Sequence, residues 1–491
     1  MVIAVFVILF AIFPLTDTDI WWHLACAREW VTTWTPVRAP VINVHEYFQL
    51  VVGFVYGLGG APLLVAFKAV LWGAVFALFL RKENVIARSR MATKQSILKI
   101  VVCAFLLFIF RYQFEIRPVL FSLLFLGVYW NVLPKLFLCR HSGTERLPIR
   151  IASAILVLFL QWLWCKCQGL YVLGPIFATL VLGIALLDAK KQRDLSVKTV
   201  APQVAFVLLL WLMPFLHREG LALFLYPFGL LDRLLGLTPS AAVFASQIAE
   251  NRSPITFLMA GENALQSALM IVLSVVGIVL GVWKTKVVLE RPQGAIESIT
   301  LVVSALLALI AERNFVLFLP VFLSVIWESF SCTLLRASMM RSNPFIRILS
   351  LVVIAFVLGL WARSLSAYDL SMVAYQRVPV NAAAWMAKHP HSGRLFNDDR
   401  AGGYLALMNP ADSIYIDGRF ILKTADFFER YLEYANVPAR FLHDADSLGI
   451  DRALFPLQYY ARWDALLHAL QQDSRWHLAY RDEYFAVFDK K

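Results

Sequence analysis

Asp17-Thr18-Asp19-Ile20-Trp21-Trp22-His23-Leu24 directly follows a short apolar run, residues 2–15, at the beginning of the chain. Two carboxylates, a histidine and a tryptophan pair therefore stand where a hydrophobic segment ends. Ionisable groups at membrane level are costly, and they are usually retained for catalysis, ion binding or proton transfer. The stretch predicts a functional site at the end of a membrane helix.

The composition places most of the chain in a lipid bilayer. Of the 491 residues, 60% are hydrophobic and 16% are charged, whereas soluble domains are roughly 45–50% apolar. A net charge of +12 would suggest nucleic acid for a soluble protein, but in a membrane protein it more often reflects Lys and Arg in cytoplasmic loops. We therefore expect no nucleic-acid partner. The six cysteines show neither a disulfide framework nor a zinc pattern.

Hydropathy predicts about eleven membrane segments, several of them near or below the roughly 17 residues that a span needs. They lie at residues 2–15, 61–80, 97–110, 119–134, 151–164, 171–187, 199–216, 264–283, 298–311, 315–330 and 347–362. The first run lacks a basic start and a cleavage site, so we expect it to be retained as a helix. The loops after every second segment carry about twice as many Lys and Arg residues as the opposite loops, which predicts a cytoplasmic N-terminus. Two long loops are then outside, together with the C-terminal region. We call them the first loop (residues 16–60) and the second loop (residues 217–262).

The composition changes after Arg363. Residues 364–491 hold most of the Asp residues and several turn signals, between short alternating runs such as 413–416 and 484–488. Helical patterns appear at about 379–388, 424–436 and 461–471. The chain therefore divides into a membrane domain, residues 1–363, and a soluble α/β domain, residues 364–491, outside the membrane.

Within the first loop, apolar residues recur from Ile20 to Trp34 at spacings of three and four. This pattern predicts an amphipathic helix along the membrane surface, with tryptophans in the interface. Asp19 and His23 would share a face of it. Asp17 or Asp19 could equally be only a helix cap. A second short helix is predicted from His45-Glu46 to Gly57, ending at Gly59-Gly60.

At this point the chain resembles the polytopic GT-C superfamily of glycosyltransferases, in particular a bacterial branch with an outer C-terminal domain. The resemblance rests on the order of several motifs. They are Asp-x-Asp-x-Trp-Trp-His-Leu at 17–24, His45-Glu46, Arg117-Pro118, Glu250-Asn251-Arg252, Glu312-Arg313-Asn314, Phe396-Asn397-Asp398-Asp399, Gly402-Gly403 and Asp417-Gly418-Arg419. It implies an α-helical polytopic membrane protein with an extracytoplasmic α/β domain, in the cytoplasmic membrane.

The resemblance also implies a reaction. A sugar would pass from a polyprenyl-phosphate donor to a glycan, lipid or protein acceptor at the outer face. An aspartate of the first loop, Asp17 or Asp19, would be the catalytic base or a metal ligand, and Asp17 is favoured because it follows the membrane helix. An Asp-x-Asp pair can hold a divalent cation, which makes such a cation a candidate cofactor.

Further residues are expected to bind substrate. Cations outside the membrane would stabilise a lipid phosphate leaving group, although arginines at helix ends often only reach for lipid headgroups. Glu250 and His45-Glu46 could line the site or be ordinary loop residues. The full set of candidate substrate-binding residues is His23, His45, Glu46, Arg117, Lys166, Glu250, Arg252 and Arg313.

One segment departs from the family pattern. Where the branch tends to carry Asn and His before a Gly, this chain has Trp164-Cys165-Lys166-Cys167-Gln168-Gly169. Lys166 could replace the missing groups as a phosphate partner, or the position could be lost. Two other classes therefore stay open, a non-catalytic assembly protein and a transporter, although a transporter would more often carry ionisable residues at the bilayer midplane.

Overall fold

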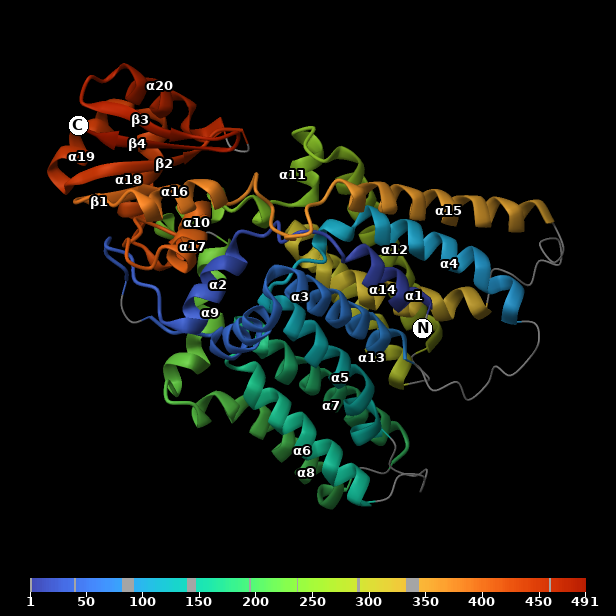
Figure 1. Ribbon diagram of the computed structural model, residues 1–491. Helices are drawn as coiled ribbons and strands as arrows, with labels where there is room; N and C mark the ends of the chain where they lie inside the picture. Colours follow the sequence, from blue (N-terminus) through green and yellow to red (C-terminus); the bar gives the residue numbers. More distant parts are fainter. Residues whose placement is uncertain are drawn as a thin grey trace.

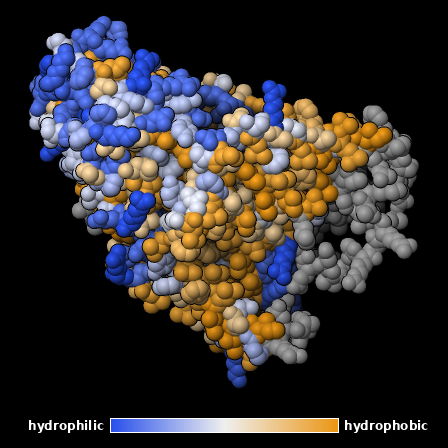
Figure 2. All heavy atoms as spheres, in the orientation of Figure 1, coloured by the Kyte–Doolittle hydropathy of each residue, from blue (hydrophilic) through white to orange (hydrophobic). Residues whose placement is uncertain are grey.

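The computed structural model describes residues 2–38, 41–81, 92–138, 147–193, 196–235, 237–288, 292–332, 344–458 and 461–491. Within these ranges, eight helices are long and apolar enough to cross a membrane. Figure 2 shows an apolar surface over the helical body and a hydrophilic surface over the C-terminal domain. The protein is a multi-pass helical membrane protein, as predicted. Several basic residues behind the topology prediction lie outside the described residues.

Every predicted membrane segment contains a helix. These helices are α1 (Val2–Phe10), α3 (Glu46–Leu80), α4 (Ala92–Ile109), α5 (Pro118–Leu138), α6 (Leu147–Trp164), α7 (Leu173–Lys191), α8 (Val197–Leu212), α12 (Ala264–Val288), α13 (Pro292–Ile310), α14 (Phe315–Cys332) and α15 (Pro344–Ser366). The first is shorter than expected, because α1 ends at Phe10 ahead of Pro14. Asp17 is therefore separated from its helix by a short irregular segment.

Helix α3 consists of two helices joined at a glycine pair. Gly59 and Gly60 have non-helical backbone angles, and Gly60 has a φ of 64°, which a residue with a side chain rarely adopts. The part before the pair belongs to the first loop, and the part after it is the predicted membrane segment. The expected helix start at Glu46 and break at Gly59-Gly60 are both confirmed.

The interfacial helix of the first loop is predicted wrongly. Helix α2 (Asp19–Arg28) stops six residues before Trp34, and the chain then continues extended, with Thr33 bridged to Ile414. Residues 20–25 are all buried, because α2 lies between α3 and the C-terminal helix α17 (Asp399–Met408) (Figure 1). Trp21 and Trp22 are 1% and 7% exposed, so they are core residues and not anchors in the membrane interface.

The second loop is helical and connects the two domains. It contains α9 (Leu221–Leu235), α10 (Pro239–Gln247), a 3-10 turn (Ala249–Asn251) and α11 (Pro254–Met259). Helix α10 packs against α18 (Ala425–Asn436) of the C-terminal domain, where the rings of Phe244 and Phe428 stack with centroids 5.2 Å apart. The 3-10 turn carries Glu250 towards the helix ends of the membrane domain.

The C-terminal domain is α/β, as predicted. Its sheet has the order β1-β2-β4-β3, in which β1 pairs parallel with β2 and the other pairs are antiparallel. The strands are β1 (Arg394–Asn397), β2 (Ile450–Pro456), β3 (Trp476–Arg481) and β4 (Phe485–Lys490), and the helices are α16 (Val380–Lys388), α17, α18 (Ala425–Asn436), α19 (Pro438–Leu448) and α20 (Asp464–Gln472). The expected strand at 413–416 is instead an irregular segment that contacts the first loop.

The C-terminal domain and the first loop form one packed unit (Figure 1). Lys423 donates to the Thr33 and Thr35 hydroxyls at 2.6 and 2.7 Å. Arg419 donates to the Val31 carbonyl at 2.9 Å, and its guanidinium lies 4.8 Å from the Trp30 ring centroid. These contacts tie the first loop, which carries the two aspartates, to the C-terminal domain.

Candidate functional site

The centre of the site is an ion-paired chain of three residues from distant parts of the sequence. Nε of Arg117, at the start of α5, lies 2.7 Å from Oδ2 of Asp17, and its Nη1 lies 2.6 Å from Oε2 of Glu250. A second Arg117 nitrogen donates to Asp17 Oδ1 at 3.3 Å. The Asp17 side chain is 5% exposed, whereas Arg117 and Glu250 are only partly buried. The two carboxylates and the arginine from three predicted motifs thus form one cluster.

Asp19 lies next to this chain and has a different environment. Its backbone N–H donates to Asp17 Oδ1 at 3.2 Å, so Asp17 also has the helix-start role that the capping interpretation expected. Burial raises the pKa of Asp19 to about 8, and the neighbouring Asp17 carboxylate adds to the rise, while Arg117 opposes it. Asp19 nevertheless keeps part of its surface exposed. It is the carboxyl of the pair that combines access with a proton affinity near neutral pH.

Two further ionisable residues extend the cluster below Asp17. Lys68, which is fully buried in α3, donates to the Phe13 carbonyl at 3.1 Å and lies 3.9 Å from a Glu115 oxygen. The Thr16 hydroxyl donates to the other Glu115 oxygen. The sequence interpretation did not select either residue, although a lone lysine inside the apolar segment 61–80 is itself a signal of function.

Besides Arg117, two arginines act on the cluster through their charge: Arg313, which the sequence selected, and Arg377, which it did not. Arg313 lies close enough for its charge to act on Glu250, and it donates no hydrogen bond within the described residues. Burial lowers the pKa of Arg377, from the segment after α15, to about 10, and its charge also reaches Asp17 and Glu250. Arg252 instead makes a two-bond pair with Glu262, at 2.5 and 3.2 Å.

His23 and His45 meet at one side of the site. Their ring centroids are 5.2 Å apart, and Gln49 approaches His23 Nδ1 at 3.5 Å. Burial lowers the pKa of His45 to about 4 and that of His23 well below its ordinary value. Both imidazoles are therefore neutral at physiological pH and suited to packing and hydrogen bonding rather than to binding an anion by charge.

Lys166 is engaged by carboxylates. Its Nζ lies 2.9 Å from Glu46 and 2.8 Å from Glu219, and its side chain is 3% exposed. A buried lysine between two carboxylates joins the start of α3 to the second loop. In this arrangement Glu46 and Glu219 neutralise the charge of Lys166, so Lys166 is not available to bind a phosphate.

The Asp17 carboxylate already has a cationic partner in the Arg117 guanidinium. Both Asp17 oxygens accept N–H groups of Arg117. The part of the chain that the structure describes holds no group of three or more His, Cys, Asp or Glu side chains that could hold a metal ion. Between Asp17 and Glu250 the positive charge comes from a guanidinium, and the candidate cation stays an untested prediction.

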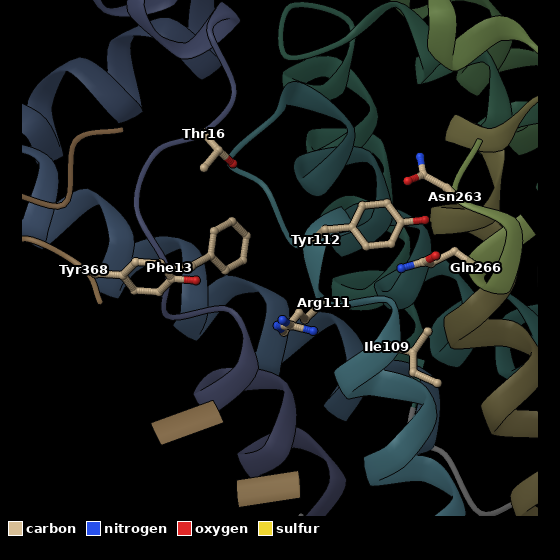
Figure 3. A pocket seen from close by; sticks show the side chains of 8 residues that line it. All are labelled: Phe13, Thr16, Ile109, Arg111, Tyr112, Asn263, Gln266 and Tyr368. Atoms are coloured by element: carbon tan, nitrogen blue, oxygen red, sulfur yellow. The ribbon is translucent and has the colours of Figure 1, made fainter. Parts of the chain in front are cut away.

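A cavity of about 340 Å³ lies beside the cluster. Figure 3 shows Arg111 between Phe13 and Tyr368 on one side and Tyr112 and Gln266 on the other. Thr16 also lines the cavity and connects it to Glu115. Within the described residues Arg111 has no carboxylate partner, since its one hydrogen bond goes to the Phe108 carbonyl at 2.7 Å. The cavity therefore offers a cation and several polar groups, and the Thr16–Glu115 contact connects it to the cluster.

Comparison with solved structures identifies the fold. The chain matches the Archaeoglobus fulgidus oligosaccharyltransferase, crystallised with a tethered acceptor peptide, over 100% of its own length and 74% of that chain, with a TM-score of 0.53 and 12% identity. The chain has the GT-C fold. It also aligns with ArnT from Cupriavidus metallidurans over 98% of its own length and 95% of that chain, with a TM-score of 0.47 and 14% identity. No protein family model and no curated sequence matches it.

The GT-C fold explains why the site residues come from loops. Asp17, Arg117, Glu250 and Arg313 all lie at helix ends on the side of the bundle that carries the C-terminal domain. Loops on a rigid scaffold commonly carry catalytic residues. His23 and His45 pack against each other at one side of this site. Arg252 and Lys166 instead pair with other carboxylates.

Proposed function

We propose that the protein is a membrane glycosyltransferase that moves a sugar from a polyprenyl-phosphate donor to an acceptor hydroxyl at the outer face of the cytoplasmic membrane. The observation that carries the proposal is the contact of Asp17 and Glu250 with Arg117, with Asp19 alongside, at the helix ends of a GT-C fold. The oligosaccharyltransferase of the same fold was crystallised with an acceptor peptide. This chain's own acceptor is a hydroxyl group of a glycan, lipid or protein.

Asp19 is proposed as the base, in place of Asp17, which sequence position alone favoured. A general base works best when its pKa lies near the working pH, and the pKa of Asp19 is raised to about 8. Asp17 is almost fully buried, and both its oxygens are occupied by Arg117. Asp17 then has the role of positioning Arg117.

The proposed reaction is a displacement at the anomeric carbon of the sugar. The acceptor hydroxyl gives its proton to Asp19, its oxygen forms the new bond to the anomeric carbon, and the bond to the phosphate oxygen breaks. The bonding electrons leave with the lipid phosphate. Guanidinium groups stabilise such developing negative charge, and we assign this role to Arg313 and to Arg111 in the neighbouring cavity. Neither has a carboxylate hydrogen-bond partner in the described chain.

The test is transfer by the purified protein in lipid nanodiscs. Polyprenyl-phosphate and polyprenyl-diphosphate donors with radiolabelled sugars are combined with glycan, lipid and peptide acceptors, and product is separated by chromatography. We expect transfer with at least one donor, a loss of at least about 100-fold in Asp19→Asn, and a comparable loss in Asp17→Asn. Arg252→Gln serves as the matched control, because Arg252 is paired away from the aspartates.

Two results would overturn the proposal. One is the absence of transfer across the whole donor panel by protein that unfolds cooperatively on heating. The other is full activity in both aspartate variants. Either result would favour the non-catalytic assembly protein or the transporter.

A further inference from the structure

A turn of the C-terminal domain packs against the part of the first loop that carries Asp19. The turn Asp417-Gly418-Arg419 of the C-terminal domain lies against α2. A Cβ atom added to Gly418 would be 2.1 Å from Oδ1 of Asp19 and 3.4 Å from Cδ1 of Trp22. Real side-chain carbons essentially never approach this closely, so Gly418 touches the Asp19 carboxyl only because it has no side chain.

Neighbouring glycines show that this contact belongs to a continuous interface. A Cβ on Gly403, in α17, would be 2.6 Å from the backbone nitrogen of Trp22. A Cβ on Gly402 would be 2.0 Å from the carbonyl oxygen of Ile416, just before the turn. Glycine permits such close backbone approach. The two motifs thus bring the α17 backbone and the turn onto the helix that starts with Asp19.

Charged side chains fix the turn in this position. The Asp417 carboxylate accepts the Arg419 backbone N–H at 2.9 Å and its Nε at 3.0 and 3.1 Å. Arg419 Nη2 donates to the Val31 carbonyl at 2.9 Å, and its Nη1 donates to Cys26 Sγ at 3.6 Å. Arg419 therefore joins its own turn both to α2, through Cys26, and to the segment that follows α2, through Val31.

We propose that the Gly418 turn is a wall of the catalytic site: its backbone packs directly against the Asp19 carboxyl and holds that carboxyl in position to act as the base. The inference rests on the proposed function only in assigning Asp19 as the base, because the contact between Gly418 and Asp19 involves no substrate. Gly418 is a positioning residue, because it acts through Asp19. The C-terminal domain, which the sequence presents as an appended unit, then contributes to the chemistry of the membrane domain.

The contact has a definite electrostatic consequence. The charged groups with the largest effect on Asp19 are Asp17, Arg117 and Glu250. The turn itself carries Asp417 and Arg419, which pair with each other, and the Gly418 backbone lies directly against the Asp19 carboxyl. Burial is the largest cause of the raised pKa of Asp19. A methyl group at position 418 would push the carboxyl away from the wall and toward water, and the pKa of Asp19 would fall toward its ordinary value.

The experiment compares the wild type, Gly418→Ala and the control Gly57→Ala. Gly57 is an exposed helical glycine with nothing within 4 Å of an added Cβ. Infrared difference spectra are recorded from pH 4 to 10, and the carboxyl band that disappears in Asp19→Asn is titrated. The transfer rate is measured over the same range. We expect the band midpoint and the rise of kcat with pH to lie near 8 in the wild type and in Gly57→Ala, and at least about one pH unit lower in Gly418→Ala.

The spectra separate this inference from the proposed function. If the wild type transfers no sugar but the Asp19 band still shifts in Gly418→Ala, the proposed function fails and the wall stands. If the Gly418→Ala midpoint equals that of the wild type, the wall is refuted, whatever the activity. If Gly418→Ala lowers the thermal stability but leaves the midpoint of the Asp19 band unchanged, the contact has only a structural role and the inference is likewise refuted.

Discussion

Arg117 Nε lies 2.7 Å from Asp17 Oδ2, although the two residues are 100 positions apart in the chain. The same guanidinium reaches Glu250 at 2.6 Å. One arginine at the start of α5 therefore connects the first loop to the second loop. This relationship turns two loop motifs into parts of one site.

Replacing Arg117 by Met should destabilise the protein and abolish transfer. The substitution leaves the buried Asp17 carboxylate without its cation, and breaking a buried pair costs on the order of 3 kcal/mol. Arg117→Lys should be intermediate, because an ammonium keeps the charge but cannot reach both carboxylates as a planar fork. Thermal unfolding in detergent and the transfer assay measure the two effects.

Arg252→Met is the control for this series. Arg252 pairs with Glu262, whose side chain is 48% exposed, and exposed pairs contribute only about 0–1 kcal/mol. An Arg117→Met protein that unfolds at the same temperature as Arg252→Met would contradict the role given to Arg117.

Asp19→Asn should stabilise the protein at high pH. The pKa of Asp19 is raised from 3.8 to about 8 in the fold, so the folded protein holds a proton that the unfolded chain releases. Stability from this group is therefore complete below pH 3.8 and is lost as the pH rises through 8. Asparagine has no proton to lose, and the Tm of the variant relative to wild type should increase from pH 4 to about pH 8 and then level off. A Tm difference that stays constant over this range would contradict the raised pKa.

Much of the membrane architecture is readable from the sequence because it is local. Long apolar runs must form helices in a bilayer, since no water satisfies their backbone groups. Gly59-Gly60 marks a break because a positive φ needs glycine. The sequence places Asp17, Arg117 and Arg313 near helix ends and Glu250 in the second loop, and the fold brings these parts of the chain together.

The parts that sequence reasoning missed depend on long-range packing. The spacing of apolar residues in the first loop is compatible with a surface helix, and only the contact with α17 buries α2 on every side. At the level of sequence, Asp417-Gly418-Arg419 is only one motif of the resemblance, because nothing local shows that Gly418 faces Asp19. Lys68 is different, since its position within an apolar segment was a signal that could have been used.

Replacing Lys166 by Met should destabilise the join between the two loops. Glu46 and Glu219 both lie within 3 Å of Lys166 Nζ. Without this ammonium group the two carboxylates would face each other with less positive charge between them. We expect a loss on the order of 3 kcal/mol, seen as a lower Tm, and partial recovery in Lys166→Met with Glu219→Gln. Lys198→Met, at an exposed lysine, is the control. An unchanged Tm in Lys166→Met would refute the structural role of this pair.

Arg111→Ala should weaken binding of the donor more than it slows catalysis. Arg111 borders the cavity and has no carboxylate partner in the described chain. Hydrogen bonds to charged groups contribute about 1.5–3 kcal/mol, so KM for the lipid donor should rise about 10- to 100-fold. Arg363→Ala, at an exposed arginine of α15, should leave KM unchanged. A KM for Arg111→Ala that matches Arg363→Ala would remove Arg111 from the site.

Lys423→Met should loosen the first loop without unfolding the C-terminal domain. Lys423 is 3% exposed, and all four of its hydrogen-bond acceptors belong to the first loop: the hydroxyls of Thr33 and Thr35 and the carbonyls of Thr35 and Pro36. A methionine fills the space but leaves these oxygens without their donor, which costs about 1–3 kcal/mol for a buried group.

The expected result is faster trypsin cleavage after Arg38, which is exposed and donates its backbone N–H to the Leu422 carbonyl at 2.8 Å. Cleavage through local opening follows the population of the open state, so a loss of about 1.4 kcal/mol in loop stability gives about a tenfold faster cut. Mass spectrometry of the fragments measures the rate, and Lys388→Met, at an exposed lysine of α16, is the control. Because the loop carries Asp19, transfer should fall in proportion to the open population. Equal cleavage rates in the two variants would mean that the C-terminal domain does not hold the loop through Lys423.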